Sequence, residues 1–441
     1  MKKTIVVIDG GGRGSALVWK YSQSPHVDKI IAIPGNDMMQ DLTEKKVAVY
    51  THLKTTSIKE ILEICKKENV DLVDVAQDNA VAAGLVDVLM ENTITVVGPT
   101  KLAGELEWSK AYSQEFMRKH NIPSAAFQIC HSEEEGIAFI NAQKKSSWFI
   151  KADGLAEGKG ALPAENNADA IEKIKEMSRF GSAGKTFLIE EWLKNADGSL
   201  GKEFSTFAIS DGNTFQIIGS AQDHKRARNG DTGENTGGMG CSSPPLVLTD
   251  EIQSEVQSIF QKVFDGMRKE GRPYKGILYL GGILINNTLY VIEFNARWGD
   301  PEAEVIVPSI TNDLYEIAMA VVHCSLHDIK IHTDGKARVV VAGCSKGYPS
   351  DYSAVKGKEI IGLEKVTYMD NVLLFGAGVK VENQKYLANG GRLFYIVGEG
   401  KDVIVAREKA YDAMKLVNIE GNNLHYRTDI GWRDIARLKR V

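Results

Sequence analysis

Residues 4–8 are a continuous apolar run, Thr-Ile-Val-Val-Ile, that leads directly into a glycine-rich turn. The turn reads Asp9-Gly10-Gly11-Gly12-Arg13-Gly14, and a helical pattern of apolar residues follows it. A strand, a glycine turn and a helix in this order are typical of a doubly wound α/β domain, where the helix N-terminus can receive a phosphate. The spacing is not the G-x-G-x-x-G fingerprint, so a dinucleotide is weakly indicated and a purely structural turn stays an alternative.

Further apolar segments continue this pattern along the first hundred residues. The predicted strands are residues 29–33, 71–75 and 93–97, with helix-period segments between them. Two of the strands are followed by polar loops, at 34–37 and 76–79, and the second loop contains Asp78. Because open α/β sheets bind ligands beyond the carboxyl ends of their strands, we expect these loops to contact a ligand.

The composition narrows the class of protein. With 441 residues, 43% of them hydrophobic and 25% charged, the chain has the length of several domains. Acidic residues (58) outnumber basic ones (53) and no basic tract stands out, so we expect no nucleic-acid partner. The five scattered cysteines form no CxxC pair, which argues against disulfides or a zinc site. No signal sequence and no apolar run of about 18 residues is visible, so we expect a cytoplasmic protein without membrane contact.

The segment 222–240 combines several glycines with charges of both signs. Asp223, His224, Lys225, Arg226 and Asp231 stand beside or within this glycine-rich stretch. Glycines allow backbone N–H groups to approach an anion closely, and neighbouring cations attract it from a distance. We therefore predict a ligand-binding loop. The alternative, a flexible surface loop, is disfavoured because flexible linkers are usually rich in Gly and Ser.

A second glycine-rich loop follows the apolar residues 148–150. Lys151 lies on the predicted strand and Lys159 at the centre of the loop. One lysine on a rigid strand and one on a loop that can fold over it can together hold a polyphosphate. The order G-x-x-x-x-G-K-[ST] is absent, so the loop is not a Walker A motif. Either lysine alone would more often be a solvated charge.

Residues 187–193 read as an apolar strand that ends in a pair of acids, Glu190 and Glu191. We expect this strand at a sheet edge, where its backbone can bind the rim of an adenine, and we expect Glu203 to bind ribose hydroxyls. Without further context, two surface glutamates are the alternative.

Residues 277–285 and 288–294 are apolar runs separated by Asn286-Asn287, which predicts a β-hairpin. Alternation along the second strand places Glu293, Asn295 and Arg297 on one face. Carboxylate and amide oxygens suit Mg²⁺, which bridges phosphates, and a guanidinium suits a carboxylate or phosphate.

Taken together, these motifs resemble the phosphoribosylamine–glycine ligase family, the glycinamide ribonucleotide synthetases of the ATP-grasp superfamily. The motifs that carry the resemblance are Asp223-His224-Lys225-Arg226, Asp231-Thr232-Gly233, Asn235-Thr236-Gly237-Gly238-Met239-Gly240, Glu293-Phe294-Asn295-x-Arg297-x-Gly299-Asp300-Pro301-Glu302, Lys151-Ala152-Asp153-Gly154-Leu155-Ala156-x-Gly158-Lys159-Gly160 and Glu190-Glu191-Trp192-Leu193. Gly347-Tyr348-Pro349, Gly390-Gly391-Arg392 and Tyr426-Arg427-x-Asp429-Ile430-Gly431 extend the resemblance to the C-terminal region.

The resemblance implies an α/β fold of three parts. These are an N-terminal doubly wound (pre-ATP-grasp) domain at 1–107, a central ATP-grasp fold of two α+β lobes at 108–330, and a small mixed α/β domain at 331–441 that packs near the N-terminal domain. The nucleotide lobe is expected at about residues 123–193. The resemblance also favours a monomer.

The resemblance further implies a two-step ligation. ATP phosphorylates the carboxylate of glycine, and the amine of 5-phosphoribosylamine then displaces phosphate. By this resemblance the catalytic residues are Arg297, Asp300 and Lys151, and the ligands of magnesium or manganese are Glu293 and Asn295. The ATP-binding residues are Lys110, Lys151, Gly158, Lys159, Gly160, Glu190, Glu191, Trp192, Leu193 and Glu203. The substrate-binding residues are Gly11, Gly12, Arg13, Asp78, Asp223, Lys225, Asp231, Asn235, Thr236 and Arg297.

The chain departs from the family pattern only in its N-terminal loops and in a longer segment at 194–202. Family members carry Gly-x-Gly-Gly-Arg-Glu-His-Ala-Leu where this chain has Asp9-Gly10-Gly11-Gly12-Arg13-Gly14-Ser15-Ala16-Leu17. They carry Pro-Gly-Asn-Ala-Gly at 34–38 and Gly-Pro-Glu-x-Pro-Leu at 76–81, where this chain differs. These loops are the expected amine site, so a sister ligase with another amine and a silent ATP-binding regulator stay as alternatives.

Overall fold

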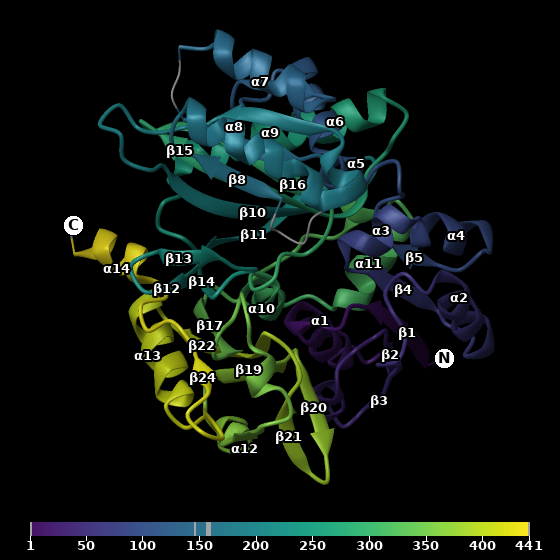
Figure 1. The fold of residues 1–441 in the computed structure, drawn as a ribbon. Helices are drawn as coiled ribbons and strands as arrows, with labels where there is room; N and C mark the ends of the chain where they lie inside the picture. The colour runs from purple at the N-terminus through teal and green to yellow at the C-terminus, as the bar shows by residue number, and fades with distance from the viewer. Residues whose placement is uncertain (1, 145–146, 156–159, 440–441) are drawn as a thin grey trace.

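The computed structural model describes residues 2–144, 147–155 and 160–439 (Figure 1). The N-terminal and C-terminal regions lie side by side at the bottom of Figure 1, and the central region covers them from above. Among the described helices, none is both long enough and apolar enough to span a membrane.

The N-terminal region is a five-stranded parallel sheet in the order β3-β2-β1-β4-β5. Its elements are β1 (Lys3–Ile8), α1 (Gly12–Ser22), β2 (Val27–Ala32), η1 (Asp37–Leu42), β3 (Lys46–Val49), α2 (Ile58–Lys67), β4 (Leu72–Val75), α3 (Asp78–Ala83), α4 (Leu85–Glu91) and β5 (Val96–Val97). The order confirms the predicted doubly wound domain and its strands. Since β1 lies between β2 and β4, the loops after these three strands open at one edge of the sheet.

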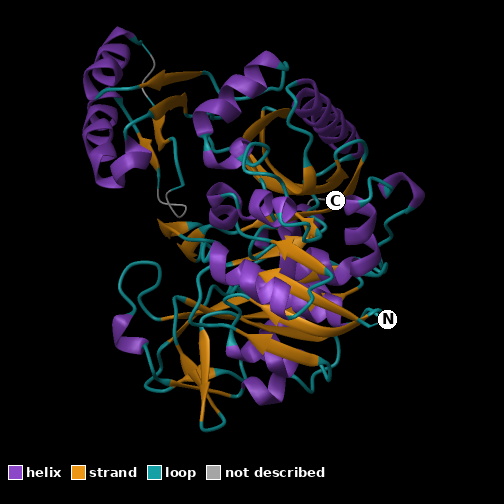
Figure 2. Cartoon of the chain, turned by 90° about the vertical axis from the view of Figure 1, so that its right-hand side faces the viewer, coloured by secondary structure: helices purple, strands orange, loops and turns teal. Residues whose placement is uncertain are grey.

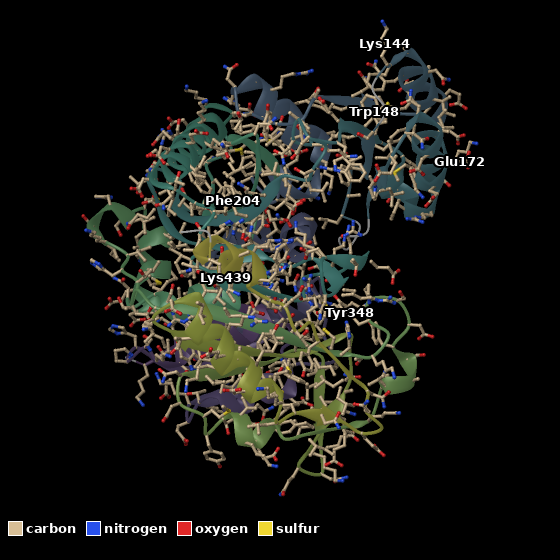
Figure 3. All side chains as sticks on the ribbon, turned by 90° about the vertical axis from the view of Figure 1, so that its left-hand side faces the viewer. Lys144, Trp148, Glu172, Phe204, Tyr348 and Lys439 are labelled. Carbon is tan, nitrogen blue, oxygen red and sulfur yellow. The ribbon has the colours of Figure 1, made fainter. Side chains whose placement is uncertain are left out.

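The region predicted as the nucleotide lobe, called by that name below, has a separate four-stranded sheet in the order β6-β9-β7-β8. Its elements are β6 (Phe127–Cys130), α7 (Glu133–Ala142), β7 (Trp148–Ala152), β8 (Ala161–Ala164), α8 (Asn167–Lys175), η2 (Glu176–Gly184) and β9 (Phe187–Glu191), and α5 (Glu105–Trp108) and α6 (Lys110–Lys119) precede them. Figure 2 shows the lobe at upper left with its helices outermost. In Figure 3 the labelled Trp148 and Glu172 lie in this lobe, and Phe204 lies in the neighbouring large sheet.

A nine-stranded antiparallel sheet forms the base below this lobe. Its order is β16-β15-β10-β11-β14-β17-β22-β19, and β24 pairs with β17. The central elements are β10 (Lys202–Asp211), β11 (Phe215–Asp223), β12 (Arg226–Arg228), β13 (Thr232–Asn235), β14 (Gly240–Ser243), α9 (Asp250–Lys269), β15 (Lys275–Ile285), β16 (Thr288–Asn295), α10 (Ala303–Ile306), η3 (Val307–Ser309), α11 (Leu314–Val322) and η4 (Leu326–Asp328). Asn286 and Asn287 both have positive φ (48° and 64°) and connect β15 to β16, which confirms the predicted hairpin.

The C-terminal strands continue the same sheet, because β17 pairs with β14. The elements are β17 (Ala337–Ser345), η5 (Ser353–Val355), β18 (Glu359–Ile361), α12 (Leu363–Val366), β19 (Val372–Gly376), β20 (Val379–Glu382), β21 (Lys385–Ala388), β22 (Arg392–Gly400), α13 (Val403–Met414), β23 (Asn418–Ile419), β24 (Leu424–His425) and α14 (Trp432–Leu438). The region packs on the N-terminal domain: Ser15 Oγ and Asn36 Nδ2 both donate to the carbonyl of Gly376, at 2.6 and 3.0 Å. One buried apolar cluster joins Leu17, Ile306 and Val340 across all three regions.

Candidate active site

A hollow of about 310 Å³ opens on the large sheet between β10, β11, β15 and β16. Its charged lining residues are Glu203, Asp223, Lys225 and Glu293. They are separated by as many as 90 positions in the sequence, and the antiparallel pairing of these strands brings them together. The structure thus gathers four predicted site residues in one place.

Lys225 is the cation at the centre of this hollow. Its Nζ lies 3.8 Å from Glu203 Oε2. Burial opposes the charge, but Tyr279, Glu203, Glu293 and Asp223 outweigh it, so the pKa of Lys225 is raised. Burial, with the nearby Glu302, raises the pKa of Asp223. Lys225 therefore stays charged, and more than one neighbouring carboxylate interacts with its positive charge.

Glu293, Asn295 and Arg297 form a connected row at the end of β16. Asn295 Nδ2 donates to Glu293 Oε1 at 3.4 Å, and Arg297 Nη2 donates to Asn295 Oδ1 at 3.0 Å. Burial acts against ionisation of Glu293, but Lys225, Lys110 and Lys151 outweigh it and lower the pKa of Glu293. The carboxylate is therefore ionised and faces three lysines, a charge pattern that suits a metal ion and phosphates between them.

Arg297 is held by Glu107, a residue that belongs to none of the sequence motifs. Arg297 Nη2 lies 3.0 Å from Glu107 Oε1, and the backbone N–H of Ala296 donates to Glu107 Oε2 at 2.7 Å. Burial raises the pKa of Glu107 to about 7, and Arg297 opposes that rise. Asp78 also contributes to the field at Arg297, so the start of α3, after β4, lies near this guanidinium. Because Glu107 stands 190 positions before Arg297, no local signal reveals the pair.

In the nucleotide lobe, Lys151 and Glu190 form a buried ion pair. Lys151 Nζ lies 2.5 Å from Glu190 Oε2, and Gln114 Nε2 donates to Glu190 Oε1 at 3.1 Å. Lys110 begins α6, and its backbone N–H donates to the carbonyl of Asp153 at 3.1 Å. The charges of Lys110 and Lys151 both act to lower the pKa of Glu293 on the large sheet. The predicted Gly158 and Lys159 lie outside the described residues, and the buried Gly160 accepts a hydrogen bond from Ala152 N at 2.8 Å.

The expectation of an edge strand at 187–193 is wrong. β9 pairs with β6 on one side and β7 on the other. The backbone N–H groups of Glu191 and Trp192 donate to the carbonyls of Ala126 and Ser147. A short strand of acidic and apolar residues fits an inner position as well as an edge, and only the pairing partners, about 40 and 60 residues away, decide between them. The backbone N–H groups of Glu191 and Trp192 are therefore already paired within the protein.

The segment 222–240 is divided between the hollow and the C-terminal region. Asp231 faces away from the hollow, where Arg427 Nη1 and Arg433 Nη2 each lie 2.8 Å from its carboxylate. Thr236 Oγ1 donates to the carbonyl of Lys225 at 2.8 Å and stabilises the turn, and Asn235 is exposed on β13. Asp223 and Lys225 thus face the hollow, while Asp231 holds the loop to two arginines that were not predicted as site residues.

The N-terminal loop packs against the segment that follows Arg297. Arg13 is 5% exposed, and its Nη1 donates to the carbonyl of Trp298 at 2.7 Å. Asp300 accepts a hydrogen bond from Tyr395 Oη at 2.6 Å and pairs with Arg392 Nη1 at 2.9 Å. A Cβ built on Gly12 would overlap Tyr395 and Glu304. The predicted residues Gly11, Gly12, Arg13 and Asp300 are therefore close together, but Arg13 and Asp300 already have protein partners.

Two buried acids near this contact were not predicted from the sequence. Glu304 is fully buried, and neither of its carboxylate oxygens accepts a hydrogen bond from a described residue. Burial and the neighbouring Asp300 raise its pKa well above the ordinary value. Asp74 lines a second hollow of about 380 Å³ beside Arg297 and Trp298, accepts a hydrogen bond from Tyr21 Oη at 2.8 Å, and has its pKa raised by burial to about 6.

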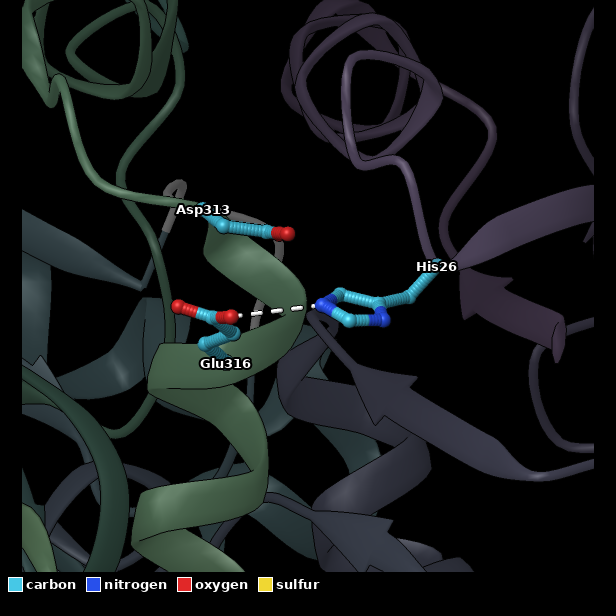
Figure 4. Close-up of side chains that lie close together, drawn as sticks. All are labelled: His26, Asp313 and Glu316. Atoms are coloured by element: carbon cyan, nitrogen blue, oxygen red, sulfur yellow. Dashed lines mark hydrogen bonds and ion pairs between the residues drawn. The ribbon is translucent and has the colours of Figure 1, made fainter. Parts of the chain in front are cut away.

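Among the described residues, one group of three His, Cys, Asp or Glu side chains has its ligand atoms within 4.8 Å of one another, and it lies away from the hollow. This group is His26, Asp313 and Glu316 (Figure 4). His26 Nε2 lies 3.2 Å from Glu316 Oε1, and Asp313 accepts hydrogen bonds from Ser24 Oγ and from Tyr315 N. These contacts link the segment before β2 to α11, and we assign no metal to them.

Comparison with known proteins shows which protein family the chain matches. A phosphoribosylglycinamide synthetase ATP-grasp (A) domain matches residues 108–303, the N domain of the same family matches 3–107, and its C domain matches 338–433. The fold is thus that of an ATP-grasp protein. The chain belongs to the phosphoribosylglycinamide synthetase family.

Individual relatives agree with this assignment. A phosphoribosylamine–glycine ligase of Caulobacter vibrioides is 36% identical, and the match covers 99% of each chain. The crystal structure of phosphoribosylamine–glycine ligase from Thermotoga maritima has a TM-score of 0.80 at 29% identity and covers 97% of this chain and 100% of that one. The trifunctional purine biosynthetic protein adenosine-3 of Gallus gallus is 37% identical over 99% of this chain, which spans 43% of the length of that relative.

Proposed function

We propose that this chain is an ADP-forming ligase that joins glycine to 5-phosphoribosylamine, giving N1-(5-phosphoribosyl)glycinamide for purine biosynthesis. The observation that carries the proposal is the row Glu293, Asn295 and Arg297 facing the lysines of the hollow and the lobe. Relatives named phosphoribosylamine–glycine ligase support the choice of substrates. The predicted monomeric state and cytoplasmic location stay part of this proposal.

The site suits a divalent metal of the hard, oxygen-binding kind, Mg²⁺ or Mn²⁺. Glu293 offers an ionised carboxylate and Asn295 an amide oxygen, and both face lysines whose positive charge attracts phosphates. When bound, the metal would neutralise phosphate charge and orient the phosphate oxygens. Glu293 and Asn295 would hold it from the sheet side.

The residues of the chain account for the rest of the chemistry. A carboxylate is a poor electrophile, so glycine must first become an acyl phosphate by in-line transfer from ATP. Lys110 and Lys151 hold the ATP phosphates from the lobe, and Arg297 neutralises the reacting carboxylate and the charge that develops on the transferred phosphoryl group. Attack by the amine on the acyl carbon then releases phosphate, and no side chain forms a covalent bond to the substrate.

A second candidate function is a sister ligase with a different amine. The observation that favours it is at position 15, where the family pattern has histidine and this chain has Ser15. Ser15 is fully buried, and its Oγ donates to the carbonyl of Gly376 at 2.6 Å. The N-terminal loop therefore lacks a titratable base at this position, and a loop of different charge suits a different amine.

The decisive test is a coupled ADP-release assay with Mg-ATP, glycine and 5-phosphoribosylamine generated in situ. We expect turnover only when all three are present. Turnover with another amine and not with phosphoribosylamine would replace the proposal with the sister ligase. Nucleotide binding without ADP release across a panel of acids and amines would instead indicate a regulator.

A further inference from the structure

The carboxylate of Asp9 closes the first loop of the chain on itself. Asp9 is fully buried at the end of β1. Its Oδ1 accepts from the backbone N–H groups of Gly11 at 2.5 Å and Gly14 at 3.1 Å, and its Oδ2 lies 2.7 Å from both Nε and Nη2 of Arg13. One side chain thus satisfies two backbone donors at the start of α1 and neutralises the buried Arg13.

Gly14 leaves room for this carboxylate. A Cβ built on Gly14 would lie 2.8 Å from both Cβ and Oδ1 of Asp9, closer than real Cβ contacts allow. The backbone of Gly14 is helical, so the glycine is required here by space and not by backbone conformation. Position 14 can therefore carry a side chain only if position 9 does not.

Helix capping explains what an acid at position 14 would do. The N-cap of α1 is Gly11, so Gly14 occupies the third helical position. A glutamate at this position characteristically reaches back to the N–H of the N-cap residue. Asp9 accepts from that same N–H, of Gly11, from the opposite direction along the chain. The family pattern, glycine at 9 and glutamate at 14, and the pattern here, aspartate at 9 and glycine at 14, are two ways to place one carboxylate.

The carboxylate also acts at a distance through Arg13. Arg13 Nη1 donates to the carbonyl of Trp298 at 2.7 Å, next to Arg297. Because Asp9 fixes the other side of the same guanidinium, the loop of the N-terminal domain and the segment 297–300 are held in one arrangement. Loss of the carboxylate would free Arg13 and shift both.

We propose that Asp9 and Gly14 are a matched pair, in which Asp9 is the positioning residue that sets the N-terminal loop and, through Arg13, its contact with Trp298. The inference rests on the proposed function for its kinetic part, since the loop is assigned to the amine substrate. It means that the two departures from the family pattern at 9 and 14 compensate each other and leave the charge of the loop unchanged.

A double-mutant cycle tests the pairing itself without any substrate. The variants are Asp9→Gly, Gly14→Glu and the double variant, and urea unfolding gives their folding equilibria. We expect each single change to weaken folding and the double variant to recover at least tenfold over the product of the two single effects. Additive single effects would overturn the pairing.

Steady-state kinetics test the positioning role with the acid and amine that support turnover. Asp9→Asn keeps the size of the side chain and removes its charge, so we expect a rise of about tenfold in KM for the amine, with KM for ATP within about twofold. The double variant should return to within about threefold of wild type. Asp28→Asn, an exposed carboxylate paired with Lys2, is the matched control. An unchanged amine KM in Asp9→Asn would overturn the positioning role, whereas turnover with a different amine would overturn only the proposed function.

Discussion

The large sheet and the N-terminal loop use their charged residues in opposite ways. On the large sheet, Glu293 on β16 and Lys225, between β11 and β12, face an open hollow, with no partner closer than 3.4 Å among their described side-chain contacts. On the N-terminal side, Asp9 and Arg13 are buried and bonded to each other and to the backbone. The charged side chains of the large sheet are therefore available to a ligand, whereas those of the N-terminal loop stabilise the conformation of the loop backbone.

This difference predicts which positions tolerate substitution. A side chain that binds phosphate or metal directly has few replacements, because charge, length and direction all matter. A side chain that supports a loop can be replaced by another that reaches the same backbone groups. The departures from the family pattern at 9–15, 34–38 and 76–81 fall in the N-terminal domain, whereas the longer segment at 194–202 leads into β10 of the large sheet.

The largest effect is expected from Glu293→Gln. The change removes the ionised oxygen that faces Lys225, Lys110 and Lys151, and we expect kcat to fall about a thousandfold with the fold intact. Initial rates of ADP release measure it, with Glu255→Gln on the exposed face of α9 as control. A rate within tenfold of wild type would remove Glu293 from the metal site.

Arg297→Ala should lower turnover by more than about a hundredfold, because one charge contact in the transition state is lost. The change leaves Glu107 buried without its cation, so Arg297→Ala is also made together with Glu107→Gln. Glu107→Gln alone keeps the arginine and its bond to Asn295, and we expect a loss of about tenfold. Equal losses in the two single variants would show that Arg297 acts only through Glu107.

Asp74→Asn tests a buried carboxylate of the N-terminal domain through the stability of the protein. Burial raises the pKa of Asp74 from 3.8 to about 6, so its contribution to folding is complete below the ordinary pKa and is lost as the pH rises through about 6. Between about pH 5 and about pH 7.5, wild type should lose roughly 1 to 2 kcal/mol relative to the asparagine variant. Urea unfolding across this range measures the difference, and parallel curves would contradict the assignment.

The smallest effect is expected from Arg433→Gln. Arg433 is partly exposed and shares Asp231 with Arg427, so its loss should loosen the segment 222–240 without opening it. We expect an increase of about fivefold in substrate KM and little change in kcat. An unchanged KM would mean that Arg427 alone holds the loop.

The sequence predicts well those features that depend on neighbouring residues. The β15–β16 hairpin follows from Asn286-Asn287, and the row Glu293, Asn295 and Arg297 follows from strand alternation. β3 was not predicted, although residues 47–50 are a short apolar run, because a four-residue strand at a partly exposed sheet edge is hard to distinguish from a connecting segment.

Features that depend on distant partners were not predictable in this way. The inner position of β9, the Glu107–Arg297 pair and the continuity of the large sheet into β17 each join segments that are remote in the sequence. Asp9 and Gly14 are near neighbours in the sequence, but only the structure shows that the Asp9 side chain occupies the space beside Gly14.

The ladder between β14 and β17 sets how this chain can be divided for expression. Gly240 to Ser243 pair with Arg338 to Val341, so a truncated chain that stops at residue 330 leaves β14 as an unpaired edge. Such edges recruit strands from other molecules and promote aggregation. The C-terminal hundred residues are therefore part of the sheet that carries the hollow, whereas the lobe has four strands and a buried apolar cluster of its own. A division of the chain for expression is therefore better placed around that lobe than between β14 and β17.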